Sequence, residues 1–171
     1  MDSTKFIQDF ISASRGTLDR MPVDKISAAA DLVFATWKAG GCVFIAGNGG
    51  SASTATHMAC DMAKMTIVGD MPRLRTLGLN DNIPLVSALT NDDGWENIYT
   101  EQLKNWQIGA HDLLITISVH GGSGKDKAGA WSQNLTKAIN YANERGAKTI
   151  GMAGFDGGAM KSLCTVAVVV P

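Results

Sequence analysis

The sequence predicts a single α/β domain, in which helices cover both faces of a parallel sheet. Three observations support this prediction. Short runs rich in Val, Ile and Leu recur without polar alternation, as in strands buried on both faces. Segments with helical spacing of apolar residues separate these runs. Turns rich in Gly and Ser follow several of them, and a chain of 171 residues is about one domain.

Residues 1–40 are predicted to form a helical arm of two helices. Their apolar residues recur at helical spacing: Phe6, Ile7, Phe10 and Ile11 in the first, and Ile26, Ala29, Ala30, Val33, Phe34 and Trp37 in the second. Pro22 suits the start of the second helix, and Gly40 and Gly41 end it. The apolar stripes also make the arm a candidate subunit interface.

Residues 41–171 are predicted to form the α/β core. Strands are expected at 42–46, 74–79, 113–118, 148–152 and 164–170. Helices are expected at 52–64, 83–89 and 95–106, before Arg145, and as one turn after Asp156. In parallel sheets the ligand lies beyond the carboxyl ends of the strands, so the loops that follow strands are the expected site.

The composition excludes several classes of protein. A net charge of −1 without a basic cluster argues against nucleic acid as the main ligand. The longest apolar runs are strand-sized, too short to cross a membrane, and the N-terminus lacks a signal-peptide pattern. Cys42, Cys60 and Cys164 lack metal or disulfide spacing and are predicted to be buried free thiols, which fits a reducing cytoplasm.

The segment from Gly47 to Ser51 gives the strongest indication of function. It joins a buried strand directly to a helix, so backbone N–H groups and the helix N-terminus point above the sheet. The helix dipole adds about half a positive charge there. Phosphate is the small anion that most often uses this arrangement. The segment therefore indicates a phosphorylated small molecule, although tight turns that need positive φ use the same residues.

Three further loops are polar and rich in small residues, at 90–94, 118–124 and 154–158. The loop at 118–124 places two hydroxyls, those of Ser118 and Ser123, around a glycine pair that lets N–H groups crowd a phosphate. His120 in this loop either adds a charged donor or is merely solvated.

His57 and Asp61 lie four residues apart and project from one face of the helix that follows Ser51. The pair has two interpretations. It can hold a metal or share acid–base work, or it can form a helix hydrogen bond with no catalytic meaning.

Together these motifs resemble the SIS (sugar isomerase) family and, within it, the phosphoheptose isomerases, over nearly the whole chain. The residues that carry the resemblance are Gly47-Asn48-Gly49-Gly50-Ser51-Ala52, His57, Asp61, Thr90-Asn91-Asp92, the loop from Ser118 to Ser123, and Asp156-Gly157-Gly158. The resemblance implies a three-layer, flavodoxin-like doubly wound fold with a five-stranded parallel sheet, assembled as a homotetramer. It implies conversion of sedoheptulose 7-phosphate to D-glycero-D-manno-heptose 7-phosphate, an early step toward nucleotide-activated heptoses of bacterial surface glycans.

The resemblance also implies a role for each motif. Ser118, Val119, His120 and Ser123 would grip the phosphate. The sugar would be lined by Asn48, Gly49, Gly50, Ser51, Asn91 and Asp92. Asp61, with His57, would act as the acid–base group, and some members of the family bind zinc at these two positions. No organic cofactor is expected. An aldose–ketose isomerase needs such a carboxylate, because a proton moves between C1 and C2 through an ene-diol.

Three departures from the family pattern keep other functions open. Asp61 stands where Glu is usual, which draws the carboxylate back by about 1.5 Å. Val119 and His120 replace a Thr and a Ser, and an insertion spans 125–133. The chain ends at Pro171, before the family's C-terminal helix with its Gln or Glu and its His, and we expect a longer protein to carry that helix. The alternatives are a non-catalytic module that binds a phosphosugar or the replication initiator, and an isomerase of another phosphosugar.

Overall fold

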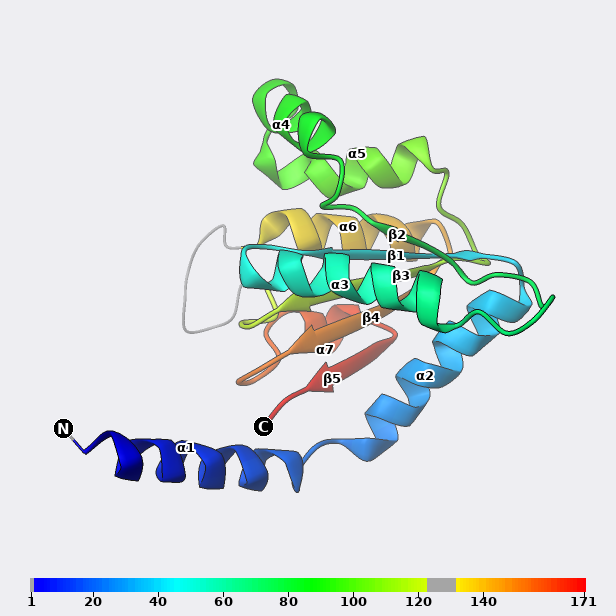
Figure 1. The fold of residues 1–171 in the computed structure, drawn as a ribbon. Helices are drawn as coiled ribbons and strands as arrows, with labels where there is room; N and C mark the ends of the chain where they lie inside the picture. The colour runs from blue at the N-terminus through cyan, green and yellow to red at the C-terminus, as the bar shows by residue number, and fades with distance from the viewer. Residues whose placement is uncertain (1, 123–131) are drawn as a thin grey trace.

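The computed structural model describes residues 2–122 and 132–171 and confirms the predicted α/β fold class (Figure 1). Its elements are α1 (Ser3–Leu18), α2 (Val23–Lys38), β1 (Cys42–Gly47), α3 (Gly50–Met65), β2 (Arg75–Gly78), α4 (Ile83–Asp92), the 3₁₀ helix η1 (Trp95–Asn97), α5 (Ile98–Asn105), β3 (Leu113–Ser118), α6 (Gln133–Glu144), β4 (Lys148–Ala153), α7 (Met160–Leu163) and β5 (Val166–Val169). All five predicted strands are present.

The five strands form one parallel sheet in the order β2-β1-β3-β4-β5. The pairing of Gly47 with Ile117 brings the carboxyl ends of β1 and β3 side by side. The chain leaves these two ends toward opposite faces, since α3 packs on one face and α6 on the other. The boundary between β1 and β3 is therefore the switch point of the sheet, where diverging loops open a crevice for a ligand.

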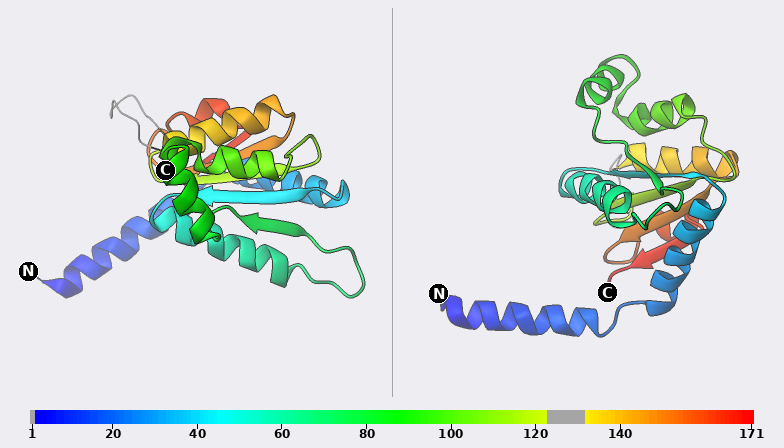
Figure 2. Two further views of the ribbon diagram at one scale, coloured as in Figure 1. Left: turned by 90° about the horizontal axis from the view of Figure 1, so that it is seen from above. Right: turned by 45° about the vertical axis from the view of Figure 1, so that its right-hand side comes forward.

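Helices cover each face of the sheet (Figures 1 and 2), and an apolar cluster lies between the sheet and the helices on each side. Val43 and Ile45 of β1 pack with α2 and α3, whereas Phe44 and Ala46 pack with α5 and α6. Successive strand residues point to opposite faces, so this alternation follows from β geometry. Both layers are buried, which explains why the strand has no polar alternation in the sequence.

Three helix boundaries differ from the prediction. α3 begins at Gly50 rather than at residue 52, and the predicted helix 95–106 divides into η1 and α5. α4 continues to Asp92 rather than ending at residue 89. The first three residues of the polar segment 90–94, which was predicted as a loop, therefore belong to the end of this helix. The hydroxyl of Thr90 donates to the carbonyl of Val86 at 2.7 Å, which lets a polar residue continue the helix.

The cysteines are free, as predicted, but they are not all buried. Cys42 is buried, Cys164 is half-buried, and Cys60 is exposed. Ala55 and Ala59 of α3 are the buried residues that face the sheet, and Cys60 lies on the other side of that helix. The apolar surroundings of Cys60 in the sequence therefore did not predict its exposure.

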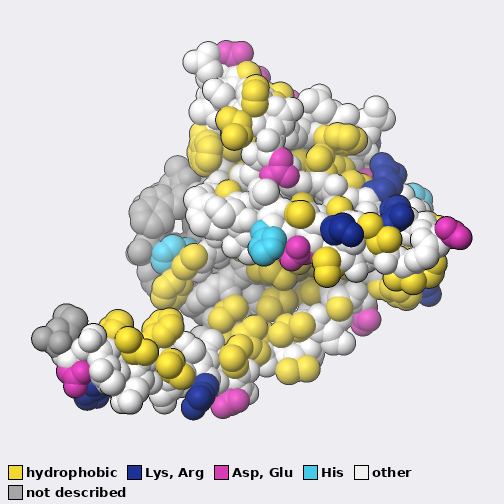
Figure 3. Space-filling view, in the orientation of Figure 1, with side chains coloured by type: hydrophobic (Ala, Val, Ile, Leu, Met, Phe, Trp, Pro, Cys, Tyr) yellow, Lys and Arg dark blue, Asp and Glu magenta, His cyan; other side chains and the backbone are white. Residues whose placement is uncertain are grey.

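α1 projects from the body as a single helix, whereas α2 packs on the sheet (Figure 2). None of the residues of α1 is buried, and Phe6, Ile7, Phe10 and Ile11 are all exposed. Hydrophobic side chains gather along α1 and also over the hollow between α2 and α3 (Figure 3). The arm therefore presents an apolar surface that the described part of the chain does not cover.

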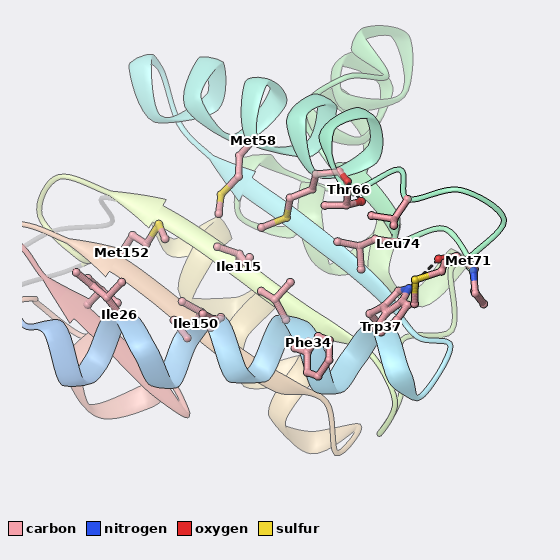
Figure 4. Close-up of a pocket in the computed structure, with 17 residues that line it drawn as sticks. Ile26, Phe34, Trp37, Met58, Thr66, Met71, Leu74, Ile115, Ile150 and Met152 are labelled. Atoms are coloured by element: carbon pink, nitrogen blue, oxygen red, sulfur yellow. Dashed lines mark hydrogen bonds between the residues drawn. The ribbon is translucent and has the colours of Figure 1, made fainter.

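The hollow between α2 and α3 is an apolar groove of about 640 Å³ (Figure 4). Its floor is the sheet, through Ile115 and Ile150, and Met58 lines the α3 side. Trp37 lies at one end, where its indole N–H donates to the carbonyl of Pro72 at 2.8 Å. Within the described ranges, no helix is both long and apolar enough to cross a membrane.

Candidate functional site

The loop after β1 leads directly into α3 at the carboxyl edge of the sheet. Gly49 has φ +56°, a conformation that side chains with a Cβ rarely adopt. A Cβ on Gly47 would lie 2.4 Å from the carbonyl oxygen of Ser51, so the turn also needs glycine at its start. Gly49 and Gly50 are exposed at the N-terminus of α3. The N–H groups of the next three residues bond to the carbonyls of Asn48 and Gly49, so the N–H groups of Gly49 and Gly50 are the ones that this turn can offer to an anion.

Asn80, which follows β2, holds the start of this loop. The N–H of Gly47 donates to Asn80 Oδ1 at 3.2 Å, and Asn80 Nδ2 donates to the Gly47 carbonyl at 2.9 Å. Asn80 Nδ2 also donates to the hydroxyl of Tyr99 at 2.7 Å, and that hydroxyl donates to the Gly47 carbonyl. The sequence analysis missed Asn80 and Tyr99. An Asn at the carboxyl end of a strand was the available signal for the first.

Tyr99 is fully buried in α5. Burial raises the pKa of its phenol from 10.0 to about 12, although the hydrogen bond from Asn80 opposes this shift. The hydroxyl therefore stays protonated at neutral pH and acts as a donor to the loop.

The side chain of Asn48 turns toward the start of α6. Asn48 Nδ2 donates to Asn134 Oδ1 at 2.9 Å, and Asn134 Nδ2 donates to Asn48 Oδ1 at 2.8 Å. Asn48 Nδ2 also lies 3.3 Å from Ser132 Oγ, at the N-cap of α6. Asn134 is fully buried and is a third residue, after Asn80 and Tyr99, that was not predicted from the sequence. The reciprocal pair ties the loop after β1 to the helix that follows β3.

The loop after β3 contains the residues predicted to grip phosphate. Ser118 is buried at the end of β3, and Val119 is exposed. The ring of His120 stacks on Phe155 with centroids 4.8 Å apart and planes 5° apart. Ser123, predicted to join them, lies outside the described residues, as does most of the insertion predicted at 125–133.

Glycines let the loops after β3 and β4 pack backbone against backbone. A Cβ on Gly121 would lie 1.9 Å from the carbonyl oxygen of Gly157, and one on Gly158 would lie 2.2 Å from that of His120. The N–H of Met160 donates to the Gly121 carbonyl at 2.9 Å. The Asp156-Gly157-Gly158 motif therefore packs directly against the loop after β3.

Asn91 and Asp92 lie in the last turn of α4, where both are exposed. Asn91 Nδ2 donates to Asp92 Oδ1 at 2.6 Å. Among the residues described, the structure gives neither side chain a hydrogen bond to the loops after β1 and β3. Their role as sugar ligands remains a prediction.

His57 and Asp61 face one another on α3, with His57 Nε2 3.4 Å from Asp61 Oδ2. Their side chains are 78% and 57% exposed, so a substrate or a second subunit can reach them. A zinc site takes three or four protein ligands. Across residues 2–122 and 132–171 there is no group of three or more His, Cys, Asp or Glu residues placed to bind one ion. The described part of one chain therefore does not by itself complete a zinc site.

The sequence is similar to a known protein family and to several named proteins. The model of the family described as "SIS domain" matches residues 9–154. The lincomycin biosynthesis protein LmbN of Streptomyces lincolnensis is 46% identical over 166 residues, which cover 96% of this chain and 58% of LmbN. The phosphoheptose isomerase of Trichlorobacter lovleyi is 31% identical over 146 residues, covering 85% of this chain and 69% of that protein.

A solved structure extends the comparison to the fold. Phosphoheptose isomerase GmhA from Neisseria gonorrhoeae superposes with a TM-score of 0.82 at 26% identity, covering 99% of this chain and 84% of that one. The chain thus spans less than two thirds of the length of LmbN and a larger share of the phosphoheptose isomerases.

Proposed function

The chain belongs to the SIS domain family, and we propose that it is an aldose–ketose isomerase of a sugar phosphate, with sedoheptulose 7-phosphate as substrate and D-glycero-D-manno-heptose 7-phosphate as product. One observation supports this proposal above the others. Two glycine-rich loops begin side by side at the switch point, and the Asn48–Asn134 pair ties the first of them to the start of α6. Relatives named phosphoheptose isomerase carry the same domain.

In this proposal the phosphate binds to the backbone and hydroxyl groups of the loop after β3, and the sugar extends along the loop after β1 toward α3. Fixing the phosphate far from C1 positions the reacting carbons, which can contribute several kcal/mol to catalysis. Asp61 is the base that moves the proton between C1 and C2, and His57 is 3.4 Å away to orient the carboxylate or protonate an oxygen.

Zinc and assembly belong to the proposal as well. A zinc ion held by His57 and Asp61 would need at least one ligand from outside the described residues, and when bound it would polarise the sugar oxygens. The exposed stripe of α1 and the groove between α2 and α3 support assembly into a homo-oligomer, with a tetramer as the expected form.

The identity of 46% to a lincomycin biosynthesis protein supports a second candidate of the same reaction class. The substrate would then be another phosphosugar, and the pathway would be antibiotic biosynthesis rather than surface glycans. A third candidate, a non-catalytic module that binds a phosphosugar or a protein partner, is supported by Asp61 in place of the usual Glu and by Val119 and His120 in the loop after β3.

The test is to incubate the protein with sedoheptulose 7-phosphate in D₂O, with and without zinc, and to follow the products by NMR. We expect an aldose that carries solvent deuterium at C2, because the ketose gains a proton there. Asp61→Asn should lower turnover by about 10² to 10⁴ while phosphosugar binding persists. Asp70→Asn, at an exposed carboxylate after α3, is the matched control.

The outcomes separate the candidates. Absence of aldose under every condition contradicts the heptose isomerase, and turnover of a different ketose phosphate favours the second candidate. Binding without turnover of any phosphosugar favours the third.

A further inference from the structure

Asn48 and Asn134 meet through both ends of their side-chain amides, with N···O distances of 2.9 and 2.8 Å. An Asn amide has two N–H donors and an oxygen with two lone pairs. Asn48 uses one donor on Asn134 and the other on Ser132 Oγ, at 3.3 Å. Its oxygen accepts from Asn134, and the Tyr99 hydroxyl lies 3.3 Å away on its other side. Both donors and one of the two lone pairs of Asn48 are therefore used within the protein, because the Tyr99 hydroxyl already donates its one proton to the Gly47 carbonyl.

The partners of Asn48 are fixed in turn. Asn134 is fully buried as the second residue of α6, and its Oδ1 also accepts from the backbone N–H of Leu135 at 2.9 Å. Tyr99 is fully buried and is held by Asn80 at 2.7 Å. A buried polar group that loses its partner costs free energy, so these side chains cannot turn away without penalty.

We infer that Asn48 and Asn134 form an amide lock, which fixes the distance between the loop after β1 and the start of α6, and that Asn48 is a positioning residue rather than a ligand of the sugar. This inference rests on the proposed function, since the lock matters for catalysis only if both loops hold one substrate. The sugar then binds to Gly49, Gly50 and Ser51, which lie beyond the lock and are exposed or half-exposed.

A double-mutant cycle tests the lock. Asn48→Ala and Asn134→Ala should each lower kcat/KM by roughly tenfold to a hundredfold, as a misplacement of about 1 Å would. The double variant should be no worse than the worse single variant, because either change already breaks the lock. Asn140→Ala, exposed on the same helix, is the control and should keep wild-type kcat/KM. Additive losses would overturn the inference, since a sugar contact of Asn48 does not depend on Asn134.

A second set of variants covers the case in which the alanine variants do not fold. Asn48→Asp and Asn134→Asp each keep the side-chain volume and one of the two hydrogen bonds. Combined, they oppose two carboxylates, which raises the pKa of one of them. Activity relative to wild type should therefore be lost at neutral pH and recovered as the pH falls and a shared proton bridges the pair. A pH profile that matches wild type would overturn the inference.

Side-chain amide exchange in the wild-type protein separates this inference from the proposed function. The N–H₂ protons of Asn48 should exchange slowly by NMR, with or without inorganic phosphate. Fast exchange overturns the lock even if the protein isomerises sugars. Slow exchange without any isomerisation retains the lock and contradicts only the proposed function.

Discussion

The side-chain amide of Asn80 pairs with both backbone groups of Gly47, at 3.2 Å to the N–H and 2.9 Å to the carbonyl. This pairing continues the sheet beyond its last ladder bonds, because Asn80 follows β2 and Gly47 ends β1. The loop after β1 therefore leaves the sheet from a fixed point.

Asn80→Ala is expected to destabilise the protein by about 1–3 kcal/mol. The change leaves the buried N–H of Gly47 without its acceptor and removes the hydrogen bond from Asn80 to the Tyr99 hydroxyl. Urea unfolding measures the change. Asn140→Ala on the exposed side of α6 is the control and should change the free energy of unfolding by less than about 0.5 kcal/mol. Equal stability of the two variants would mean that Asn80 does not hold the loop.

Tyr99 makes stability depend on pH in the alkaline range. Its pKa rises from 10.0 to about 12 on folding, so the neutral phenol is favoured in the folded state. The resulting stability is fully present below pH 10 and is lost as the pH rises toward 12, by about 3 kcal/mol in total. The free energy of unfolding of Tyr99→Phe should therefore fall less steeply across this range.

Two controls isolate the tyrosine. Burial also raises the pKa values of Cys42 and Cys164 from 9.0 to about 11, but both thiols are present in either protein and cancel in the comparison. In Tyr141→Phe, tyrosinate absorbance reports Tyr99 alone and should rise near pH 12. Identical slopes for Tyr99→Phe and wild type would show that Tyr99 is not the group responsible.

Phe155 adopts φ +51°, and the residue is 70% exposed. A left-handed backbone costs roughly 1–2 kcal/mol for a residue with a Cβ, and little burial compensates here. Phe155→Gly should therefore keep or raise the melting temperature.

Phe155→Gly also removes the ring on which His120 stacks, so KM for the sugar phosphate should rise. Phe155→Asn, which tolerates this conformation, should behave similarly. An unchanged KM in both variants would show that the stack does not orient His120 for binding.

The apolar stripe of α1 should drive association. Changing Phe6 and Phe10 together to Ser removes two large exposed side chains. If another subunit buries them, the assembly should weaken by about 3 kcal/mol or more, which raises Kd by at least about a hundredfold. Light scattering at several concentrations measures this shift, and Gln8→Ser in the same helix is the control. An unchanged mass for the Phe variant would exclude this stripe from the interface.

The sequence predicted the sheet well because a strand that is buried on both faces is a short run of consecutive apolar residues, which can be recognised without knowing its neighbours in space. In β1, Val43 and Phe44 point to opposite faces, and both positions are apolar. The predicted end of α4 was wrong because Asn91 and Asp92 are polar residues typical of loops, yet the helix continues through both. The stripe of α1 was predicted as helical, but its lack of burial depends on what lies around it in space.

The candidate site was predicted in part. The glycine loops follow from the chain itself, since Gly49 and Gly121 both need positive φ. Asn80, Tyr99 and Asn134 were missed because their partners are 33, 52 and 86 residues away, and no local spacing encodes such pairs. Tyr99 in particular resembles an ordinary core residue of a helix until its hydroxyl is placed.

The most direct measurement is an NMR titration of the protein with sedoheptulose 7-phosphate, following backbone amides. We expect the shifts to concentrate at Gly49, Gly50 and Gly121, at the carboxyl ends of β1 and β3. Inorganic phosphate alone should move Gly121 but leave the loop after β1 nearly unchanged. Shifts confined to the groove between α2 and α3, or no shifts at saturating sugar phosphate, would contradict the account.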